Sequence, residues 1–229
     1  MFFGKPAVIL YLRRASLEVC TAQGKIQTLD FPQKDIRSLE IVDRVDFETT
    51  LTGFFKGLKK QRALILLSPG VLFQKNLAGS QSPIEKAAAQ KEFIDAIPLD
   101  PGVVAHVAFQ LGDNIYCIAT NKLLYETVKA VVEKVGWHIT GVTPAVVFGI
   151  SEEASLSSQQ IQTILGNIQL ATRVNLLNQL SLQTQGTTQT PLQPAHATTI
   201  FQLSRKQLVF IVLLIVLIVG SLVMFFMSR

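Results

Sequence analysis

The sequence predicts an α+β head, followed by a linker and one membrane-spanning helix. The head alternates between short apolar runs typical of strands and segments whose apolar side chains recur at helical spacing. Near residue 178 the composition changes to Gln, Thr, Ser and Pro, and residues 208–227 then carry no charged side chain. We therefore predict a cytoplasmic head over 1–177, a disordered linker over 178–204 and a transmembrane anchor over 205–229.

The head opens with a predicted three-stranded meander. Residues 7–12 and 15–21 are apolar runs separated by a tight turn at Arg13 and Arg14. Residues 24–31 form a weaker third strand signal.

A helix and a buried strand follow the meander. Asp46 is the predicted cap of this helix, since apolar side chains then recur every three or four residues. Residues 63–67 read ALILL, which is typical of a central strand covered on both faces. The apolar side chains on one helix face are Phe47, Leu51, Phe54, Phe55 and Leu58.

The second part of the head alternates helix, hairpin, helix and strand. Pro83 fits the first turn of a helix that runs to about Ala96, and residues 103–110 and 114–120 predict a hairpin. Asn121 caps the next helix, and residues 137–142 form the last predicted strand. One face of that helix carries Leu124, Val128, Val131, Val132 and Val135, with Gly136 as the C-terminal cap.

The last helix of the head is predicted over 157–177. Ser157 and Gln160 have the spacing of a capping box. An apolar stripe follows, which is the candidate interface: it either packs back on the head or docks on a partner or a second copy of the chain. The stripe consists of Ile161, Ile164, Leu165 and Ile168.

The predicted anchor indicates where in the cell the protein lies. Twenty residues of helix span about 30 Å, the thickness of the bilayer hydrocarbon. Arg205 and Lys206 precede the span and outweigh Arg229 after it, which predicts a head in the cytoplasm and an anchor in the inner membrane. The anchor residues include Leu208, Phe210, Ile215, Gly220 and Phe225.

No pattern in the sequence predicts catalysis, a cofactor or a metal. Walker-type, GxGxxG, HExxH and GxSxG motifs are missing, and the three histidines are scattered. Cys20 and Cys117 lack metal-ligand spacing and read as buried free thiols. Glu152 and Glu153 precede the last predicted helix, where carboxylates favour the helix dipole.

The densest basic run comprises Lys56, Lys59, Lys60 and Arg62. It lacks interleaved aromatic residues, so we predict no nucleic-acid partner and read the run first as a solvated helix face. Contact with anionic membrane lipid is the alternative that suits a tethered head.

The order of these elements resembles the first half of the actin-like, ribonuclease H-like PilM and GspL families of type IV pilus and type II secretion platforms. The likeness covers about residues 5–150, through ALILLSPGVLFQKNL at 63–77, EFIDAIPLDP at 92–101 and the segment 115–149. It implies a mixed sheet, a platform protein and other pilus or secretion proteins as partners.

Two departures from that pattern affect the expected activity. Family members that bind nucleotide carry Asp-x-Gly at the end of the first strand, whereas residues 9–14 here read ILYLRR. The second half of the actin-like fold also has no counterpart after residue 150, so the head reads as a half-fold. We expect a non-catalytic membrane-anchored scaffold; the alternatives are a degenerate actin-like nucleotide-binding protein and an unrelated tail-anchored adapter.

Overall fold

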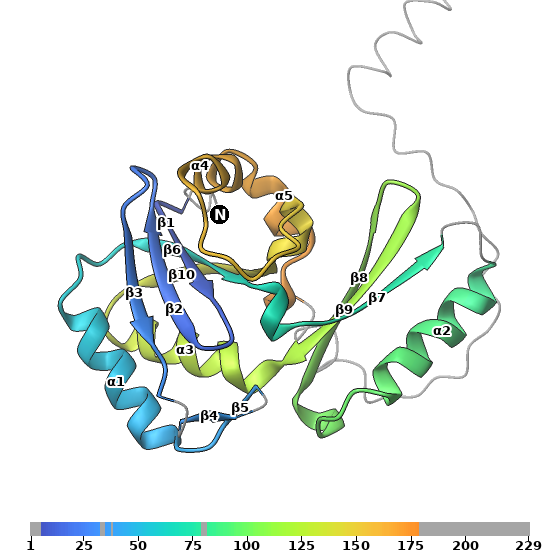
Figure 1. Ribbon diagram of the computed structural model, residues 1–229, viewed down its shortest axis with the longest axis horizontal. Helices are drawn as coiled ribbons and strands as arrows, with labels where there is room; N and C mark the ends of the chain where they lie inside the picture. The colour runs from blue at the N-terminus through green and yellow to red at the C-terminus, as the bar shows by residue number, and fades with distance from the viewer. Residues whose placement is uncertain (1–5, 33–34, 38, 79–81, 179–229) are drawn as a thin grey trace, which may run out of the picture. The chain divides into compact units, whose positions relative to one another are not determined.

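A computed structural model describes residues 6–32, 35–37, 39–78 and 82–178 (Figure 1). By its internal contacts the chain divides between Thr187 and Thr188, and every described residue belongs to the first unit. The predicted linker beyond Asn178 and the predicted anchor, with Leu208, Phe210, Ile215, Gly220 and Phe225, lie outside the described residues. Within those described residues, every helix is too short or too polar to cross a bilayer.

The head is built on a mixed five-stranded sheet with the order β10-β6-β1-β2-β3. β1 pairs antiparallel with β2, and β2 antiparallel with β3, so the predicted meander is confirmed. β6 lies parallel to both β1 and β10, which confirms the mixed sheet. The strands are β1 Val8–Leu12, β2 Ser16–Thr21, β3 Ile26–Asp30, β6 Arg62–Leu67 and β10 His138–Pro144.

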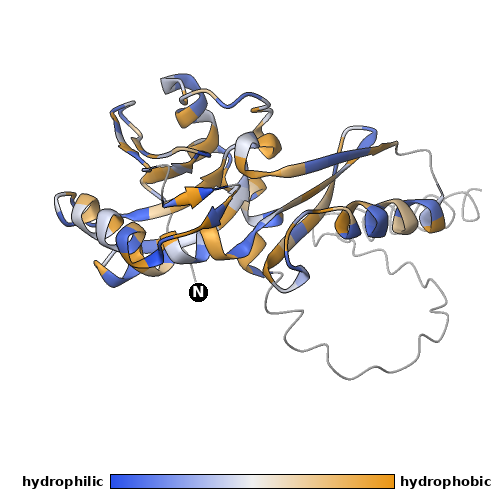
Figure 2. Ribbon diagram, turned by 60° about the horizontal axis from the view of Figure 1, so that its bottom comes forward, coloured by the Kyte–Doolittle hydropathy of each residue, from blue (hydrophilic) through white to orange (hydrophobic). Residues whose placement is uncertain are grey.

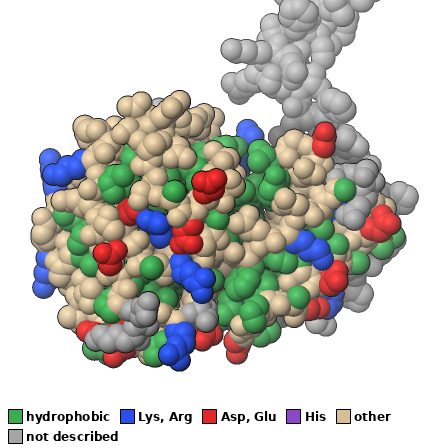
Figure 3. Space-filling model, viewed as in Figure 1, with side chains coloured by type: hydrophobic (Ala, Val, Ile, Leu, Met, Phe, Trp, Pro, Cys, Tyr) green, Lys and Arg blue, Asp and Glu red, His purple; other side chains and the backbone are tan. Residues whose placement is uncertain are grey.

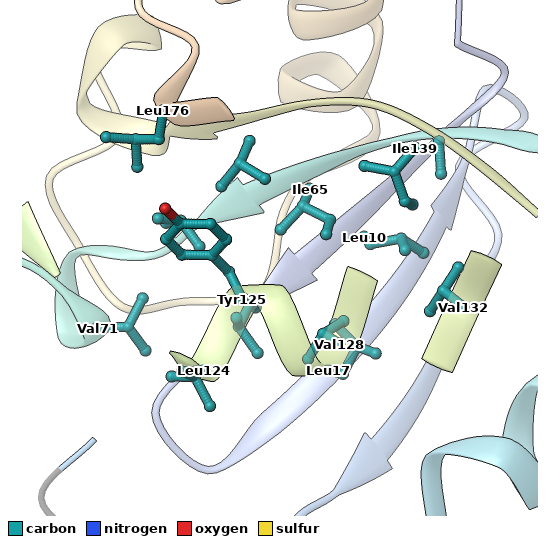
Figure 4. Close-up of a cluster of buried hydrophobic side chains, with 14 of the residues drawn as sticks. Leu10, Leu17, Ile65, Val71, Leu124, Tyr125, Val128, Val132, Ile139 and Leu176 are labelled. Carbon is teal, nitrogen blue, oxygen red and sulfur yellow. The ribbon is translucent and has the colours of Figure 1, made fainter. Parts of the chain in front are cut away.

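Helices cover both faces of this sheet (Figure 1). On one face α1, Arg44–Lys56, and α3, Lys122–Lys134, pack over the alternate side chains that include Leu10 and Ile65 and form the first core (Figure 4). On the other face α4, Ser158–Gly166, and α5, Ile168–Arg173, cover the second core. β6 contributes to both cores, which confirms a central strand buried on both faces.

A smaller sheet extends from the first. It has the order β7-β9-β8, with all neighbours antiparallel, and the predicted hairpin is its β8–β9 pair. α2, Pro83–Asp95, lies against it and is tied to β7 by Lys75 Nζ, 3.0 Å from Glu92 Oε2. None of the residues of α2 is fully buried, and Figure 2 shows hydrophilic and hydrophobic residues mixed along it. These strands are β7 Phe73–Ala78, β8 Val104–Leu111 and β9 Asn114–Asn121.

The structure corrects two helix boundaries. Asp43, not Asp46, caps α1: its Oδ1 accepts the Asp46 N–H at 2.9 Å. The helix predicted over 157–177 is broken at Asn167, whose side chain donates to the Thr163 carbonyl at 2.8 Å and so ends α4. The capping box of Ser157 and Gln160 is confirmed.

A short hairpin between the meander and α1 has no counterpart among the predicted elements. β4, Ile36–Arg37, pairs with β5, Glu40–Ile41. Leu39 has a φ of 69°, an uncommon conformation for a residue with a side chain. Its carbonyl accepts a hydrogen bond from Asn121 Nδ2 at 3.0 Å, which ties the hairpin to the start of α3.

Candidate functional site

The carboxyl ends of three parallel strands meet at one edge of the central sheet. In open sheets of this kind, ligands bind beyond the carboxyl ends of the strands. Here β1 leads into Arg13 and Arg14, β6 into Ser68 and the short 3₁₀ turn Pro69–Val71, and β10 into the 3₁₀ turn Ala145–Phe148. The strand-end site is defined here as Arg13, Arg14, Glu18, Gly70, Glu153 and Ser155.

A buried carboxylate is the centre of the strand-end site. Glu18 on β2 is only 1% exposed, and its Oε1 accepts hydrogen bonds from Arg13 Nη1 at 2.7 Å and from Ser155 Oγ at 2.6 Å. Its Oε2 has no partner among the described residues. A buried carboxylate requires a paired charge and hydrogen bonds, so Arg13 and Ser155 hold Glu18 in its place.

Glu153, which is distant from Arg14 in the sequence, occupies the strand-end site. Its Oε1 accepts the backbone N–H of Arg14 at 2.8 Å, and its carbonyl accepts Arg13 Nη2 at 3.0 Å. A Cβ placed on Gly70 would lie 1.8 Å from Glu153 Oε2, so only glycine leaves room for this carboxylate. The chain therefore places its own anion on the backbone N–H that follows β1.

Two protonated groups lie beneath these charges. Burial, and to a lesser extent the nearby carboxylates, raises the pKa of Tyr11 to about 12, and burial together with Glu18 raises the pKa of Cys20 to about 12. Both groups are neutral at pH 7. Tyr11 Oη and Ser68 Oγ are buried and find no hydrogen-bond partner within the described part of the chain.

The two histidines of the described residues lie apart, and no metal-ligand group is found there. His106 lies in β8 and His138 at the start of β10, in different sheets, and burial lowers the pKa of His106. Groups of three or more potential metal ligands are missing from the described ranges. Cys20 and Cys117 are buried free thiols, as predicted.

The predicted interface stripe lies against the head. Ile161 and Ile164 are fully buried in the second core, below α4. Leu165 and Ile168 are partly buried and pack on the same core. Ile161 and Ile164 therefore cover the second core within the head, which is one of the two alternatives that the sequence raises.

Exposed apolar side chains lie instead near the starts of α1 and α3. Val42 is 62% exposed, Val45 78% and Leu123 46%. Leu123 borders a depression of about 260 Å³ that Arg44 and Val103 also line. Sequence reasoning missed this surface, because exposure of single apolar residues at helix starts has no periodic signal.

Comparisons with known proteins gave structural likenesses only. No family model matches the chain, and no curated protein matches it. Similar solved structures include the cytoplasmic domain of EpsL, an inner membrane component of the type II secretion system of Vibrio cholerae (TM-score 0.39, 13% identity), and the PilM–PilN type IV pilus biogenesis complex (0.42, 13%). A third is a Bacteroides thetaiotaomicron protein with an actin-like ATPase fold and unknown function (0.35, 8%).

These structures are of the kinds that the sequence resembles: a pilus protein, a type II secretion protein and an actin-like fold. Each match covers 62% of this chain and between 48% and 58% of the other, so the chain spans about half of the length of the structures that it matches. At these low TM-scores and identities, the likenesses carry no function over to this chain.

Proposed function

We propose that this protein is a non-catalytic scaffold of a type IV pilus or type II secretion platform, held at the inner membrane by residues 205–229 with its head in the cytoplasm. The observation that carries the non-catalytic part is the closed strand-end site. The platform assignment and its protein partners follow from the resemblance in the sequence, and the membrane location follows from the uncharged run 208–227.

The closed site speaks against nucleotide binding for two reasons. A phosphate on the backbone N–H of Arg14 would have to displace the Glu153 carboxylate at 2.8 Å. The side chain that could then attract it, Arg13, is already committed to Glu18, which would remain as a buried negative charge. Like charges at such short range disfavour each other strongly.

The test is thermal melting of the full chain in mild detergent with and without magnesium and ATP. A ligand present at about 100 times its dissociation constant stabilises the folded state by about 2.7 kcal/mol, which shifts the melting temperature by several degrees. We expect no shift, because Glu153 already occupies the Arg14 N–H. A saturable, magnesium-dependent rise for the unaltered chain would overturn the non-catalytic proposal.

The scaffold proposal requires a partner surface, for which the exposed apolar residues Val45 and Leu123 are the best candidates. Leu123 lines the depression described above, and Val45 lines the groove between α1 and α3. Exposed apolar surface of this kind marks protein–protein contacts. Replacement of both by Glu should leave the melting temperature nearly unchanged, because neither side chain is buried, and should abolish cross-linking to platform proteins. Ile84→Glu is the matched control, since Ile84 is 83% exposed on α2.

Cross-linked partners are identified by mass spectrometry from cells that carry the chain at its native level. The proposal expects components of a pilus or secretion platform, lost in the Val45→Glu, Leu123→Glu variant and kept in the control. Cross-links only to proteins unrelated to such a platform would favour the adapter alternative and contradict the platform assignment.

A further inference from the structure

A cluster of basic side chains lies at the amino end of β6, opposite to the strand-end site. Lys56 and Lys134 line one groove between α1 and α3, although they are far apart in the sequence. The stem of Lys60 passes 3.0 Å from the position of a Cβ on Gly136, and the His138 N–H donates to the Gln61 carbonyl at 3.1 Å. We name the basic surface by its members, the exposed Lys56, Lys59, Lys60 and Lys134 and the half-buried Arg62.

Local structure accounts for only part of this charge. Lys56 and Lys134 lie in the last turns of α1 and α3, where cations favour the helix dipole. Lys60 reaches Gly136 at the C-terminal end of α3, where a cation is likewise favoured, whereas Lys59 lies in the loop from α1 to β6.

The charge of the basic surface is not neutralised by the described residues. None of its five members has an ion-pair partner there. Two of the four carboxylates on the same helices are paired with other cations: Glu48 with Arg44 at 2.6 Å and Glu133 with Lys129 at 2.6 Å. Figure 3 shows Lys and Arg side chains along the left edge of the head, over the end of α1.

We infer that the basic surface docks the head on anionic lipid headgroups, which deepens and rests on the proposed membrane location. Long exposed lysine stems suit a plane of mobile headgroups, and each basic residue near such a surface strengthens binding about fivefold. Recognition of single-stranded nucleic acid would call for exposed aromatic side chains, but Trp137 beside this surface is only 4% exposed.

The single tryptophan of the chain provides the readout, because Trp137 directly precedes His138 at the basic surface. The full chain is reconstituted with vesicles of phosphatidylcholine, with or without phosphatidylserine, that contain a trace of dansyl-labelled lipid. Energy transfer from Trp137 to the dansyl group should rise with phosphatidylserine and fall again as salt screens the charges.

The test variant replaces Lys56, Lys59 and Lys60 by Gln, and should weaken docking about a hundredfold. The matched control replaces three other basic residues by Gln: Arg37, Lys122 and Arg173. They lie on other parts of the head and also lack ion pairs among the described residues. Should the triple variant melt early, Lys59→Gln with Lys60→Gln changes only the loop and should still weaken docking about 25-fold.

Three outcomes would overturn the inference: equal transfer in both kinds of vesicle, equal loss in the test and control variants, or displacement by a short DNA duplex at the same phosphate concentration as the lipid. Failure of the anchor has a different signature. A chain that does not float with neutral vesicles contradicts the proposed anchor, whereas anionic-lipid-dependent transfer in that chain still supports the basic surface.

Discussion

Arg13 and Glu18 show how burial changes the value of an ion pair. Glu18 is almost fully buried and Arg13 is 25% exposed, whereas Arg44 in the pair with Glu48 is 68% exposed. An exposed pair contributes less than about 1 kcal/mol, but a buried carboxylate that loses its cation keeps its desolvation penalty.

The first prediction therefore concerns Arg13→Met. We expect it to lower the free energy of unfolding by about 3 kcal/mol, because Glu18 is left buried and uncompensated. Addition of Glu18→Gln should recover a large part of that loss, measured by urea unfolding. Arg44→Met is the control and should change stability by less than about 0.5 kcal/mol; equal effects at positions 13 and 44 would contradict the buried pair.

The second prediction concerns alkaline stability. Burial raises the pKa of Cys20 from 9.0 and of Tyr11 from 10.0, each to about 12. A raised folded-state pKa contributes stability that is fully present below the unfolded-state pKa and is lost as pH rises through the folded-state value. The free energy of unfolding should thus fall between about pH 9 and 12, with a limiting slope near 1.4 kcal/mol per pH unit for each group.

Denaturant melts across that pH range measure the slope. Burial also raises the pKa values of Cys117 and Tyr125. Cys20→Ala should therefore make the decline that begins near pH 9 shallower without abolishing it, while the tyrosines retain the part that begins near pH 10. Native Cys20 should also react far more slowly with thiol reagents than the same residue in urea. A native rate equal to the unfolded rate would show that this thiol is not protected.

At the scale of elements, α4 is the cover of the second core. Its capping box fixes the start at Ser158, and Ile161 and Ile164 place one face of the helix on β1 and β6. Helices this short draw their stability from packing rather than from propensity, so the helix depends on that face.

The third prediction is that Ile164→Glu prevents stable folding, since a carboxylate would enter a fully buried apolar site. Ile168→Glu should cost less, because Ile168 is only partly buried. The exposed neighbour Gln162→Glu serves as the control. The melting temperatures of the three variants are compared by circular dichroism. An Ile164→Glu variant that folds and loses only self-association would show that the stripe is an interface.

At the scale of the whole molecule, the last residues before 178 pack against the rest of the head. Leu176 is 1% exposed in the first core, and Asn175 Oδ1 accepts the Val142 N–H of β10 at 2.9 Å. The segment after α5 therefore adds Val174 and Leu176 to the first core and accepts one backbone hydrogen bond from the edge strand β10.

The fourth prediction is that a chain cut after Asn178 is soluble and melts cooperatively, as expected for a discrete head. A cut after Arg173 is the matched control: it removes Val174, Asn175 and Leu176 and should melt at a much lower temperature. Scanning calorimetry compares the two. Aggregation of the longer chain in the absence of detergent would contradict a head that folds without the residues beyond 178.

Most local elements of this protein follow from the pattern of neighbouring residues. Strand and helix periods, the caps at Ser157 and Asn121 and the buried run 63–67 act between neighbouring residues, so their signals are local and were read correctly. The boundary at Asp43 and the break at Asn167 were missed, because side chains three or four positions away compete for the same backbone groups.

The strand-end site, and the place of Lys134 beside the basic run that the sequence already contains, depend on the tertiary structure. Glu153 meets the Arg14 N–H across 139 positions of sequence, and Lys134 joins Lys56 in one groove through the packing of α3 beside α1. Periodicity and spacing in the sequence do not predict these long-range contacts, because the contacts depend on which helix covers which face of the sheet. The sequence analysis interprets Glu153 as a charge that favours a helix dipole and Lys56 as part of a solvated helix face. In the fold Glu153 binds the Arg14 N–H, and Lys56 lines a groove with Lys134.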